Sequence, residues 1–238
     1  MKLALLGYGA MGRLVETLAR GEGHEATPVA TSREAARGPE ELAELLRGHD
    51  AAIDFSSPAA VLRNATACAL AGVPLVEGTT GWQEYAAEVR EAIDARGGAL
   101  VHGANFSVGV HVFYRLVSRA AELFAAVEGY EPFIEEAHHS RKRDAPSGTA
   151  LRLRELLAAG LPAGAAEIPV ASTRAGHIPG THRVGFDSAA DQLTLTHAAR
   201  TREGFAAGAL LAARWIQGRR GVFEFSEVLD EILKGREP

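Results

Sequence analysis

The chain is poor in cysteine and lysine and has no long apolar run. Its one cysteine, Cys68, rules out an intramolecular disulfide framework and suits the reducing cytoplasm. No apolar stretch approaches the ~20 residues that span a bilayer, so we expect no transmembrane helix. The apolar start, residues 1–6, ends at a glycine turn, so this apolar run is too short for a secretion signal. These absences predict a cytoplasmic protein that does not enter a membrane.

The chain also has fewer basic residues than acidic ones. Lys and Arg together number 25 against 30 Asp and Glu, and the net charge of −5 argues against a general nucleic-acid binder. Hydrophobic residues make up 47% and charged residues 23%, an ordinary globular composition without a disorder signature. A length of 238 residues fits one large domain or two of ordinary size, and either can bury a core.

A glycine fingerprint follows the first predicted strand, residues 2–6. The segment has the pattern G-x-G-x-x-G and opens an amphipathic helix that runs to about residue 20. In this context the first glycine permits a tight turn, the second lets a pyrophosphate approach the backbone, and the third lets helix and strand pack closely. A glycine-rich turn without a ligand is the alternative. We predict dinucleotide contacts from Gly7, Tyr8, Gly9, Ala10, Met11 and Gly12.

The residues after the second predicted strand, residues 27–31, bear on the choice of cofactor. An acid at this place would bind the ribose 2′-hydroxyl of NADH, whereas an arginine accommodates the 2′-phosphate of NADPH. The sequence has Ser32 and Arg33, followed by Glu34. This pattern favours NADPH and leaves NADH open, although Arg33 could also be a solvated loop cation.

Strands and helices then alternate along the first half of the chain. Helices are predicted at residues 40–47, 57–71 and 83–95, and strands at residues 51–55, 74–77 and 99–102. This alternation predicts a doubly wound, Rossmann-type parallel sheet with its ligand at the carboxyl ends of the strands. The turns at such ends supply the further cofactor candidates, which are Phe55, Gly78, Thr79, Thr80, Ala104, Asn105, Phe106 and Ser107.

In the second half of the chain the predicted strands and helices no longer alternate. After a long helix, residues 108–126, come a strand at 130–137, a helix at 147–159 and three strands at 170–174, 182–187 and 192–198. Strands that follow one another predict an α+β domain with a mixed or antiparallel sheet. Helices are also predicted at residues 204–217 and 226–234. We place the domains at residues 1–106, completed by 215–238, and at residues 107–214.

Most of the candidate chemistry lies in one loop of this second domain, between residues 135 and 150. The loop has adjacent His138 and His139, the basic triplet that contains Lys142, and then a helix that begins at Ser-Gly-Thr. Histidine can transfer a proton near neutral pH, and free N–H groups at a helix N-terminus favour an anion. The pattern therefore favours a carboxylate or phosphate pocket with a proton donor, although a solvated basic turn remains the alternative.

With these residues in place, the chain resembles the dihydrodipicolinate reductase family along its whole length. The strongest match is Glu-x-x-His-His-x-x-Lys-x-Asp-Ala-Pro-Ser-Gly-Thr-Ala, residues 135–150. Supporting matches are Gly-Thr-Thr-Gly at residues 78–81, Ala-Asn-Phe-Ser-Val-Gly-Val at 104–110, and Arg-x-Gly-x-x-x-Gly-x-His at 174–182. The sequence departs from many members at Ser32, where they have an acid, and this departure bears on cofactor choice.

The resemblance implies reduction of a cyclic dihydrodipicolinate-type dicarboxylate to tetrahydrodipicolinate by NADPH or NADH, in the diaminopimelate pathway of lysine biosynthesis. It implies that His138 donates a proton, that Lys142 is a second acid and substrate contact, and that His139, Gly148 and Thr149 bind substrate. It also implies a homotetramer joined through the second domain.

Two other functions remain open from the sequence. A semialdehyde dehydrogenase would share the glycine loop but needs a nucleophilic cysteine, and Cys68 lies within a first-domain helix. A nucleotide-sensing regulator could use the basic loop to dock an acidic partner or RNA, which the net negative charge disfavours. We expect no metal, because no cysteine or carboxylate cluster accompanies the two histidines in the sequence.

Overall fold

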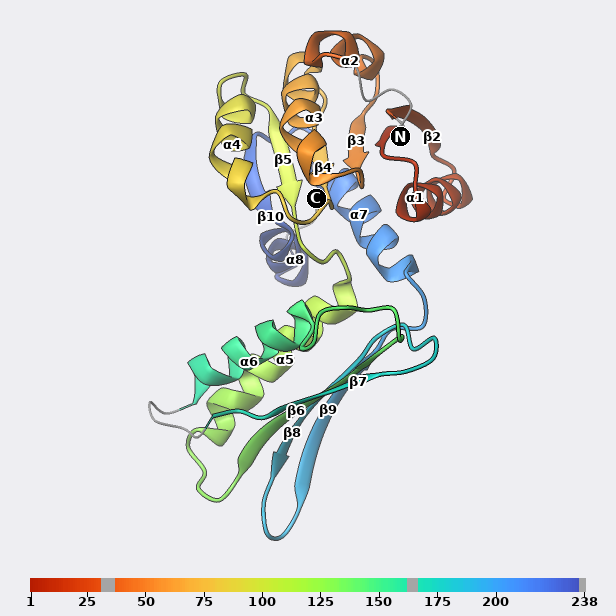
Figure 1. Cartoon of the computed structure of the whole chain (residues 1–238). Helices are drawn as coiled ribbons and strands as arrows, with labels where there is room; N and C mark the ends of the chain where they lie inside the picture. The colour runs from red at the N-terminus through yellow and green to blue at the C-terminus, as the bar shows by residue number, and fades with distance from the viewer. Residues whose placement is uncertain (31–36, 162–166, 236–238) are drawn as a thin grey trace. The chain divides into compact units, whose positions relative to one another are not determined.

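The computed structural model describes residues 1–30, 37–161 and 167–235. The chain divides into two compact units (Figure 1). The first consists of Met1–Val108 together with Glu203–Pro238, and the second is the continuous segment Gly109–Arg202. Each unit has its own sheet and its own hydrophobic core.

The first unit contains a parallel sheet of six strands in the order β10-β5-β4-β3-β1-β2. The chain moves outward from β1 to β2 and then to β3 on the other side of β1, so the strand order reverses beside β1. Ligands of such sheets bind at the carboxyl ends of the strands near this reversal. The strands are β1 (Lys2–Leu6), β2 (Glu25–Ala30), β3 (Ala51–Asp54), β4 (Leu75–Glu77), β5 (Ala99–His102) and β10 (Gly221–Glu224).

Helices cover both faces of this sheet, which confirms the predicted doubly wound fold (Figure 1). In β1, Leu3 and Leu5 face α1, α7 and α8, whereas Ala4 and Leu6 face α2, α3 and α4. Strands buried on both faces explain the continuous apolar runs in the sequence. The helices are α1 (Ala10–Gly21), α2 (Pro39–Leu46), α3 (Pro58–Ala71), η2 (Gln83–Tyr85), α4 (Ala86–Asp94), α7 (Glu203–Trp215) and α8 (Phe225–Leu233).

The C-terminal part of this unit differs from the sequence prediction. The helix predicted at residues 204–217 was assigned to the second domain, but α7 packs in the core of the first unit, so the division falls before Glu203. Small residues explain this close packing: a β-carbon on Gly208 would lie 1.7 Å from the carbonyl oxygen of Phe106. Strand β10 was not predicted at all. It pairs with β5 and extends the sheet by one strand.

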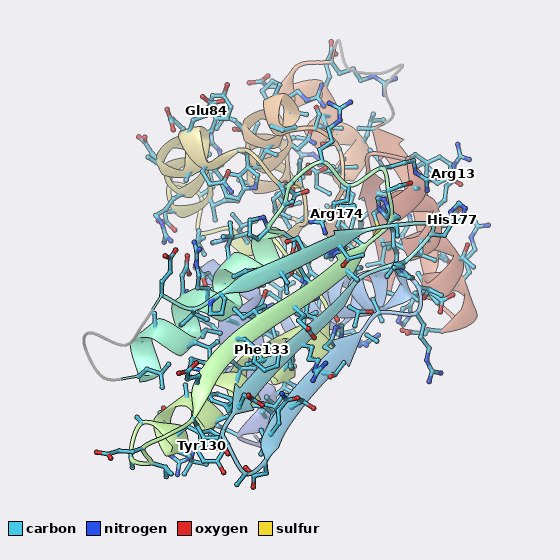
Figure 2. All side chains as sticks on the ribbon, turned by 60° about the horizontal axis from the view of Figure 1, so that its bottom comes forward. Arg13, Glu84, Tyr130, Phe133, Arg174 and His177 are labelled. Atoms are coloured by element: carbon cyan, nitrogen blue, oxygen red, sulfur yellow. The ribbon has the colours of Figure 1, made fainter. Side chains whose placement is uncertain are left out.

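The second unit has a mixed sheet of four strands in the order β7-β6-β8-β9, as predicted. β6 pairs in parallel with β7 and antiparallel with β8, which pairs antiparallel with β9. Two helices pack on one face through a core that includes Phe113, Val117, Leu153 and Val184. No helix among the described residues of this unit covers the other face, and Phe133 lies there (Figure 2). The elements are α5 (Val108–Phe124), β6 (Glu131–His138), α6 (Gly148–Gly160), β7 (Val170–Arg174), β8 (Thr181–Asp187) and β9 (Gln192–Ala198).

No helix within the described ranges is both long enough and apolar enough to cross a membrane.

Candidate active site

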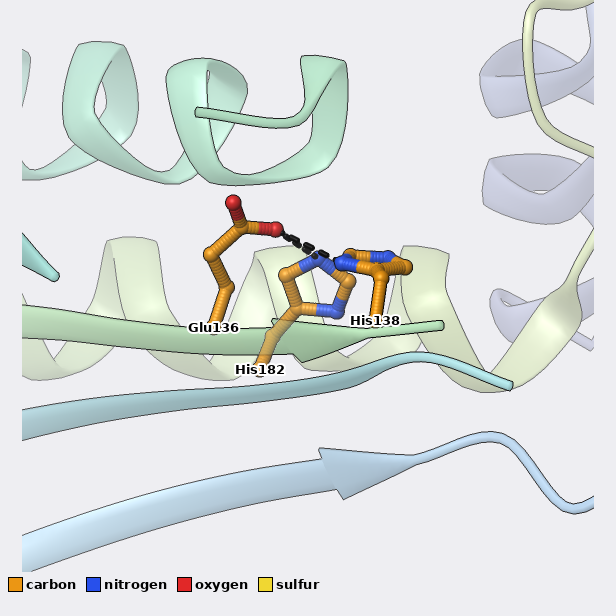
Figure 3. A group of neighbouring side chains, drawn as sticks. All are labelled: Glu136, His138 and His182. Atoms are coloured by element: carbon orange, nitrogen blue, oxygen red, sulfur yellow. Dashed lines mark ion pairs between the residues drawn. The ribbon is translucent and has the colours of Figure 1, made fainter. Parts of the chain in front are cut away.

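A buried carboxylate and a buried imidazole lie side by side at the end of β6. Glu136 and His138 are two residues apart on the strand, so their side chains lie on the same face, the one that packs under the helices. Nδ1 of His138 is 2.8 Å from Oε2 of Glu136, and the two side chains are 9% and 0% exposed (Figure 3). The strand therefore holds the imidazole ring firmly and does not leave it on a loop tip.

Three donors bind the other oxygen of Glu136. Oε1 accepts hydrogen bonds from Oγ of Ser172 at 2.6 Å, Nη2 of Arg174 at 2.7 Å and the backbone N–H of Ser147 at 3.1 Å. The register explains the first of these, since Ser172 lies opposite Glu136 in the β6–β7 pairing. Burial alone would raise the pKa of Glu136, but these hydrogen bonds outweigh it and lower the pKa to about 2. Glu136 therefore stays a carboxylate.

A second histidine, His182 of β8, completes the cluster. It lies opposite Glu136 in the β6–β8 pairing, and its ring centroid is 5.0 Å from that of His138 (Figure 3). Its Nε2 is 3.1 Å from Oγ of Ser147 and 3.9 Å from Oε2 of Glu136. Burial, and then the neighbouring His138, lower the pKa of His182 to about 4. His182 is therefore a neutral hydrogen-bonding partner near neutral pH.

The electrostatics of His138 suit a group that releases a proton. Burial lowers the pKa of His138, Glu136 opposes this effect, and the charges of Lys142 and Arg174 reinforce it. A lowered pKa makes the imidazolium a stronger acid. Space around the ring also depends on a glycine: a β-carbon on Gly180 would lie 3.1 Å from Nε2 of His138, and the φ of +148° at Gly180 strains any other residue.

The predicted substrate residues lie around this cluster. Nζ of Lys142 is 2.8 Å from Oδ1 of Asp144 and its side chain is 25% exposed, and this hydrogen bond is the main reason why the pKa of Asp144 is lowered. His139 is half-buried, and its carbonyl accepts the N–H of Lys142 in a turn. Gly148 and Thr149 form the first turn of α6, whose N-cap is Ser147. The exposed N–H groups of that turn can bind an anion.

The glycine fingerprint begins α1 in the first unit, as predicted. Gly7 has φ +84°, and a β-carbon there would lie 2.5 Å from the carbonyl oxygen of Phe55. A β-carbon on Gly12 would lie 2.2 Å from the carbonyl oxygen of Gly7, whereas one on Gly9 would contact nothing within 4 Å. Gly7 and Gly12 are thus required by the fold. Gly9 leaves an open space at the helix N-terminus, which fits an approaching phosphate.

The other cofactor candidates lie at the carboxyl ends of β3, β4 and β5. The ring of Phe55 covers Gly78, where a β-carbon would clash with it at 2.2 Å. Thr79 is buried, Thr80 and Ala104 are exposed, and Oδ1 of Asn105 accepts the N–H of Ser107 at 2.8 Å. These positions gather at one edge of the sheet, where a dinucleotide is expected.

Two cofactor predictions need qualification by the structure. The ring of Phe106 is only 2% exposed and packs against Phe225, with 4.7 Å between centroids, so its side chain belongs to the core. Ser32 and Arg33 lie outside the described residues, as does Glu34.

From the sequence we expected no carboxylate to join the histidines, but in the structure Glu136 does. Glu136, His138 and His182 each offer a ligand atom, and these atoms all lie within 4.8 Å of one another. The sequence did not reveal this set because His182 is far along the chain. However, the guanidinium of Arg174 is 2.7 Å from Glu136 and already neutralises the carboxylate. A cation close by disfavours a second one, so the chemistry of the cluster suits a proton better than a metal ion.

Sequence reasoning missed Glu136, Ser172, Arg174 and His182 as site residues. Arg174 and His182 stood in a motif that was noted without a role, and Glu136 was passed over in favour of Glu135. The alternation along β6 was the available signal, since Glu136 and His138 share a face while Glu135 is exposed and pairs with Arg183 at 3.0 Å. The contributions of β7 and β8 depend on strand register, which the sequence does not specify.

The predicted alternative with a cysteine nucleophile does not fit the structure. Cys68 is fully buried in α3, and burial raises the pKa of its thiol well above the usual value. A buried thiol of this kind is inert.

Two family models of known proteins together match almost the whole chain. The model of the N-terminal part of dihydrodipicolinate reductase matches residues 1–106, and that of the C-terminal part matches residues 109–229. The chain belongs to the dihydrodipicolinate reductase family. Members of this family are NAD(P)H-dependent oxidoreductases of the diaminopimelate route to lysine. The resemblance seen in the sequence is therefore confirmed.

Individual members of the dihydrodipicolinate reductase family match the chain over most of its length. The 4-hydroxy-tetrahydrodipicolinate reductase of Christiangramia forsetii is 35% identical over 98% of this chain and 100% of its own length. That of Anaeromyxobacter dehalogenans (strain 2CP-1) is 40% identical over 94% of this chain and 84% of its own length. A solved structure, a dipicolinate-bound dihydrodipicolinate reductase from Paenisporosarcina sp. TG-14, has a TM-score of 0.74 at 22% identity and covers 94% of this chain and 97% of that one. This last likeness supports the fold.

Proposed function

We propose that the chain reduces 4-hydroxy-tetrahydrodipicolinate, or its dehydrated dihydrodipicolinate form, to tetrahydrodipicolinate with NADPH or NADH. Family membership supports the reaction class. The observation that carries the assignment to this site is the buried Glu136–His138 pair beside a basic loop and the N-terminus of α6. A substrate with two carboxylates needs cations and N–H donors, and reduction of its ring needs a proton delivered nearby.

The first unit is the proposed dinucleotide-binding part. The open space at Gly9, the exposed N-terminus of α1 and the loops at Gly78–Thr80 and Ala104–Ser107 fit a dinucleotide. The bound cofactor would supply the hydride. We propose that NADPH is preferred, because Arg33 can pair with a 2′-phosphate while Ser32 offers no carboxylate to a 2′-hydroxyl. NADH remains an alternative substrate.

The second unit is the proposed substrate-binding part. His138 donates the proton, and Glu136 orients its ring through Nδ1 at 2.8 Å. Lys142 contacts a substrate carboxylate and acts as a second acid, while His139 and the backbone of Gly148 and Thr149 bind the substrate. Arg174 and Ser172 hold Glu136 in its ionised form. We expect the cluster to bind no metal for its activity.

We further propose that the second unit forms a homotetramer through the sheet face that carries Phe133, which none of the unit's described helices covers. Phe133 lies on that face, with the guanidinium of Arg183 at 5.6 Å from its ring. The location expected for such an enzyme is the cytoplasm.

The proposed reaction can be tested by following the loss of nicotinamide absorbance with freshly made product of the preceding synthase as substrate. We expect turnover with both cofactors and a higher kcat/KM with NADPH. No turnover with either cofactor would contradict the assigned reaction. Equal or better use of NADH would contradict only the role given to Arg33.

A further inference from the structure

A second pair of acidic residues is buried in the first unit, away from the cluster described above. Asp54 and Glu77 end the neighbouring strands β3 and β4, lie directly opposite each other in the register, and are both 0% exposed. Neither has a role in the reaction as proposed so far. In the part of the chain that the structure describes, neither carboxyl group forms an ion pair with a lysine, arginine or histidine.

Both oxygens of the Asp54 carboxyl group accept hydrogen bonds. Nδ2 of Asn64 donates to Oδ2 at 2.6 Å, and the backbone N–H of Ser56 donates to Oδ1 at 2.8 Å. An acceptor surrounded by donors is best satisfied as a carboxylate. Asn64 is itself held in place, because Nε of Arg63 donates to its Oδ1 at 3.1 Å. The orientation of the Asn64 amide is therefore fixed.

Glu77 has the complementary pattern. Its Oε1 accepts the backbone N–H of Thr79 at 2.7 Å, while Oε2 is buried and accepts no hydrogen bond from an N–H or hydroxyl group of the described residues. Asp54 is the residue paired with Glu77 across β3 and β4, so the two buried carboxyl groups are neighbours. Two carboxylates that share a dry site cannot both be ionised, so one keeps a proton. Burial, and then the charge of Asp54, raise the pKa of Glu77 well above its usual value.

The two acids fasten the loops that are the proposed cofactor contacts. Asp54 holds the turn at Phe55 and Ser56, and Glu77 holds the turn at Gly78 and Thr79. The turns are also joined to each other, because the N–H of Ser56 lies 3.1 Å from Oγ1 of Thr79. Displacing either carboxyl group would thus move both turns together.

We propose that Glu77, as a neutral acid, donates its proton to ionised Asp54, and that this pair is a positioning device that sets the two loops for dinucleotide binding. The inference rests on the proposed cofactor role of the loops. It predicts that Glu77 can be replaced by a residue that keeps one hydrogen-bond donor and one acceptor. Glutamine has the same shape as protonated glutamate, with an oxygen to accept from Thr79 and an amide N–H to donate to Asp54. Asp54→Asn would instead place an amide N–H donor against the donors from Asn64 and Ser56.

The first experiment concerns the proton and uses the protein without cofactor or substrate. Infrared difference spectra between the wild type and Glu77→Gln at neutral pH should show the C=O stretch of a protonated carboxylic acid in the wild type only. Glu91→Gln, at an exposed site on α4, is the matched control and should leave that band unchanged. Absence of the band from the wild type, or its persistence in Glu77→Gln, would overturn the shared proton.

The second experiment concerns the positioning role and compares NADPH affinity and kinetics. We expect Glu77→Gln to bind NADPH within about two-fold of wild type, and Asp54→Asn to bind about ten-fold more weakly, the usual range for mispaired buried groups. For Asp54→Asn the loss should fall on KM for NADPH, with kcat at saturation within about three-fold of wild type. If Asp54→Asn does not fold, Glu77→Met replaces it, because it removes the donor and the acceptor together.

These outcomes separate the inference from the function on which it rests. A band in the wild type, combined with equal NADPH affinity in Glu77→Met and wild type, would overturn the positioning role while the enzyme activity stands. Failure to reduce the substrate would contradict the proposed function, but the infrared result would still test the proton. Weaker NADPH binding by Glu77→Gln than by Asp54→Asn would overturn the assignment of the proton to Glu77.

Discussion

At the scale of single residues, we expect the proposed reaction to depend most on His138. A positioned general acid contributes about 10²-fold or more to turnover, and the imidazole is held at 2.8 Å by a buried carboxylate. We therefore expect His138→Gln to lower kcat by roughly 10²-fold while NADPH affinity stays near wild type. The exposed His177→Gln is the control and should keep wild-type kcat. A loss of less than a few-fold in His138→Gln would make this histidine a structural residue.

Lys142 is tested best by a change that keeps its charge. The chain uses arginine almost everywhere, so a lysine that only solvates the loop should tolerate Lys142→Arg. If Nζ, now 2.8 Å from Asp144, must reach a carboxylate or donate a proton, the planar guanidinium fails in geometry and in acidity. We expect kcat/KM to fall at least about ten-fold, or ~1.4 kcal/mol. Arg141→Lys is the matched control, and wild-type kinetics in Lys142→Arg would exclude a catalytic role.

The pH profile should report the contact between Glu136 and His138. A general acid must be protonated, so the rate falls as pH rises through the pKa of His138. The charge of Glu136 raises this pKa against burial, Lys142 and Arg174, and His182 on the same face is neutral. Glu136→Gln should therefore lower the pKa of His138 further and move the alkaline limb of kcat/KM to lower pH. Exposed Glu135→Gln should leave the limb in place, and an upward shift in Glu136→Gln would refute the coupling.

Only part of this site could be predicted from the sequence. His138, Lys142 and the start of α6 lie within one short segment, so their spacing and chemistry were visible together. Glu136 was adjacent but required the face of the strand to be known. Ser172 and His182 lie 36 and 46 residues beyond Glu136 in the sequence. The motif around His138 does not identify them, because only the register of β7 and β8 brings them to Glu136.

At the scale of elements, the start of α1 separates a folding requirement from a binding one. Gly12→Ala places a β-carbon 2.2 Å from the carbonyl oxygen of Gly7, and overpacking of this kind costs about 1–3 kcal/mol of stability. Gly9→Ala meets no atom, so it should fold with the wild-type Tm and weaken NADPH binding about ten-fold by filling the open space. Thermal unfolding and calorimetry measure both effects. Unchanged NADPH affinity in Gly9→Ala would place the pyrophosphate elsewhere.

The elements themselves were predicted well where apolar periodicity was strong. Strands β1, β3, β5 and β8 and helices α1, α3 and α5 occur close to their expected positions. β10 was missed because four residues between two helices carry too little pattern. Helix α7 was found but assigned to the wrong unit, since a run rich in alanine and glycine has no clear polar face that would indicate which core it packs against.

At the scale of the whole molecule, the open face of the second sheet bears on assembly. We expect a tetramer by sedimentation equilibrium, with Phe133→Lys weakening assembly because it places a charge on that face. Leu233→Lys is the matched control, since Leu233 is an exposed apolar residue, 54% exposed, in the first unit. A wild-type monomer, or a tetramer unaffected by Phe133→Lys, would contradict an interface at this sheet.

The interrupted first unit affects how the chain can fold during synthesis. Its core needs Leu210 of α7 and Val228 of α8, and its sheet needs β10, so it cannot be completed until α8 has left the ribosome. The second unit draws its core from Gly109–Arg202 alone and is complete earlier. Domains generally fold as units when their residues have emerged. The second unit should therefore reach its native state before residues 1–108, although these residues are translated earlier.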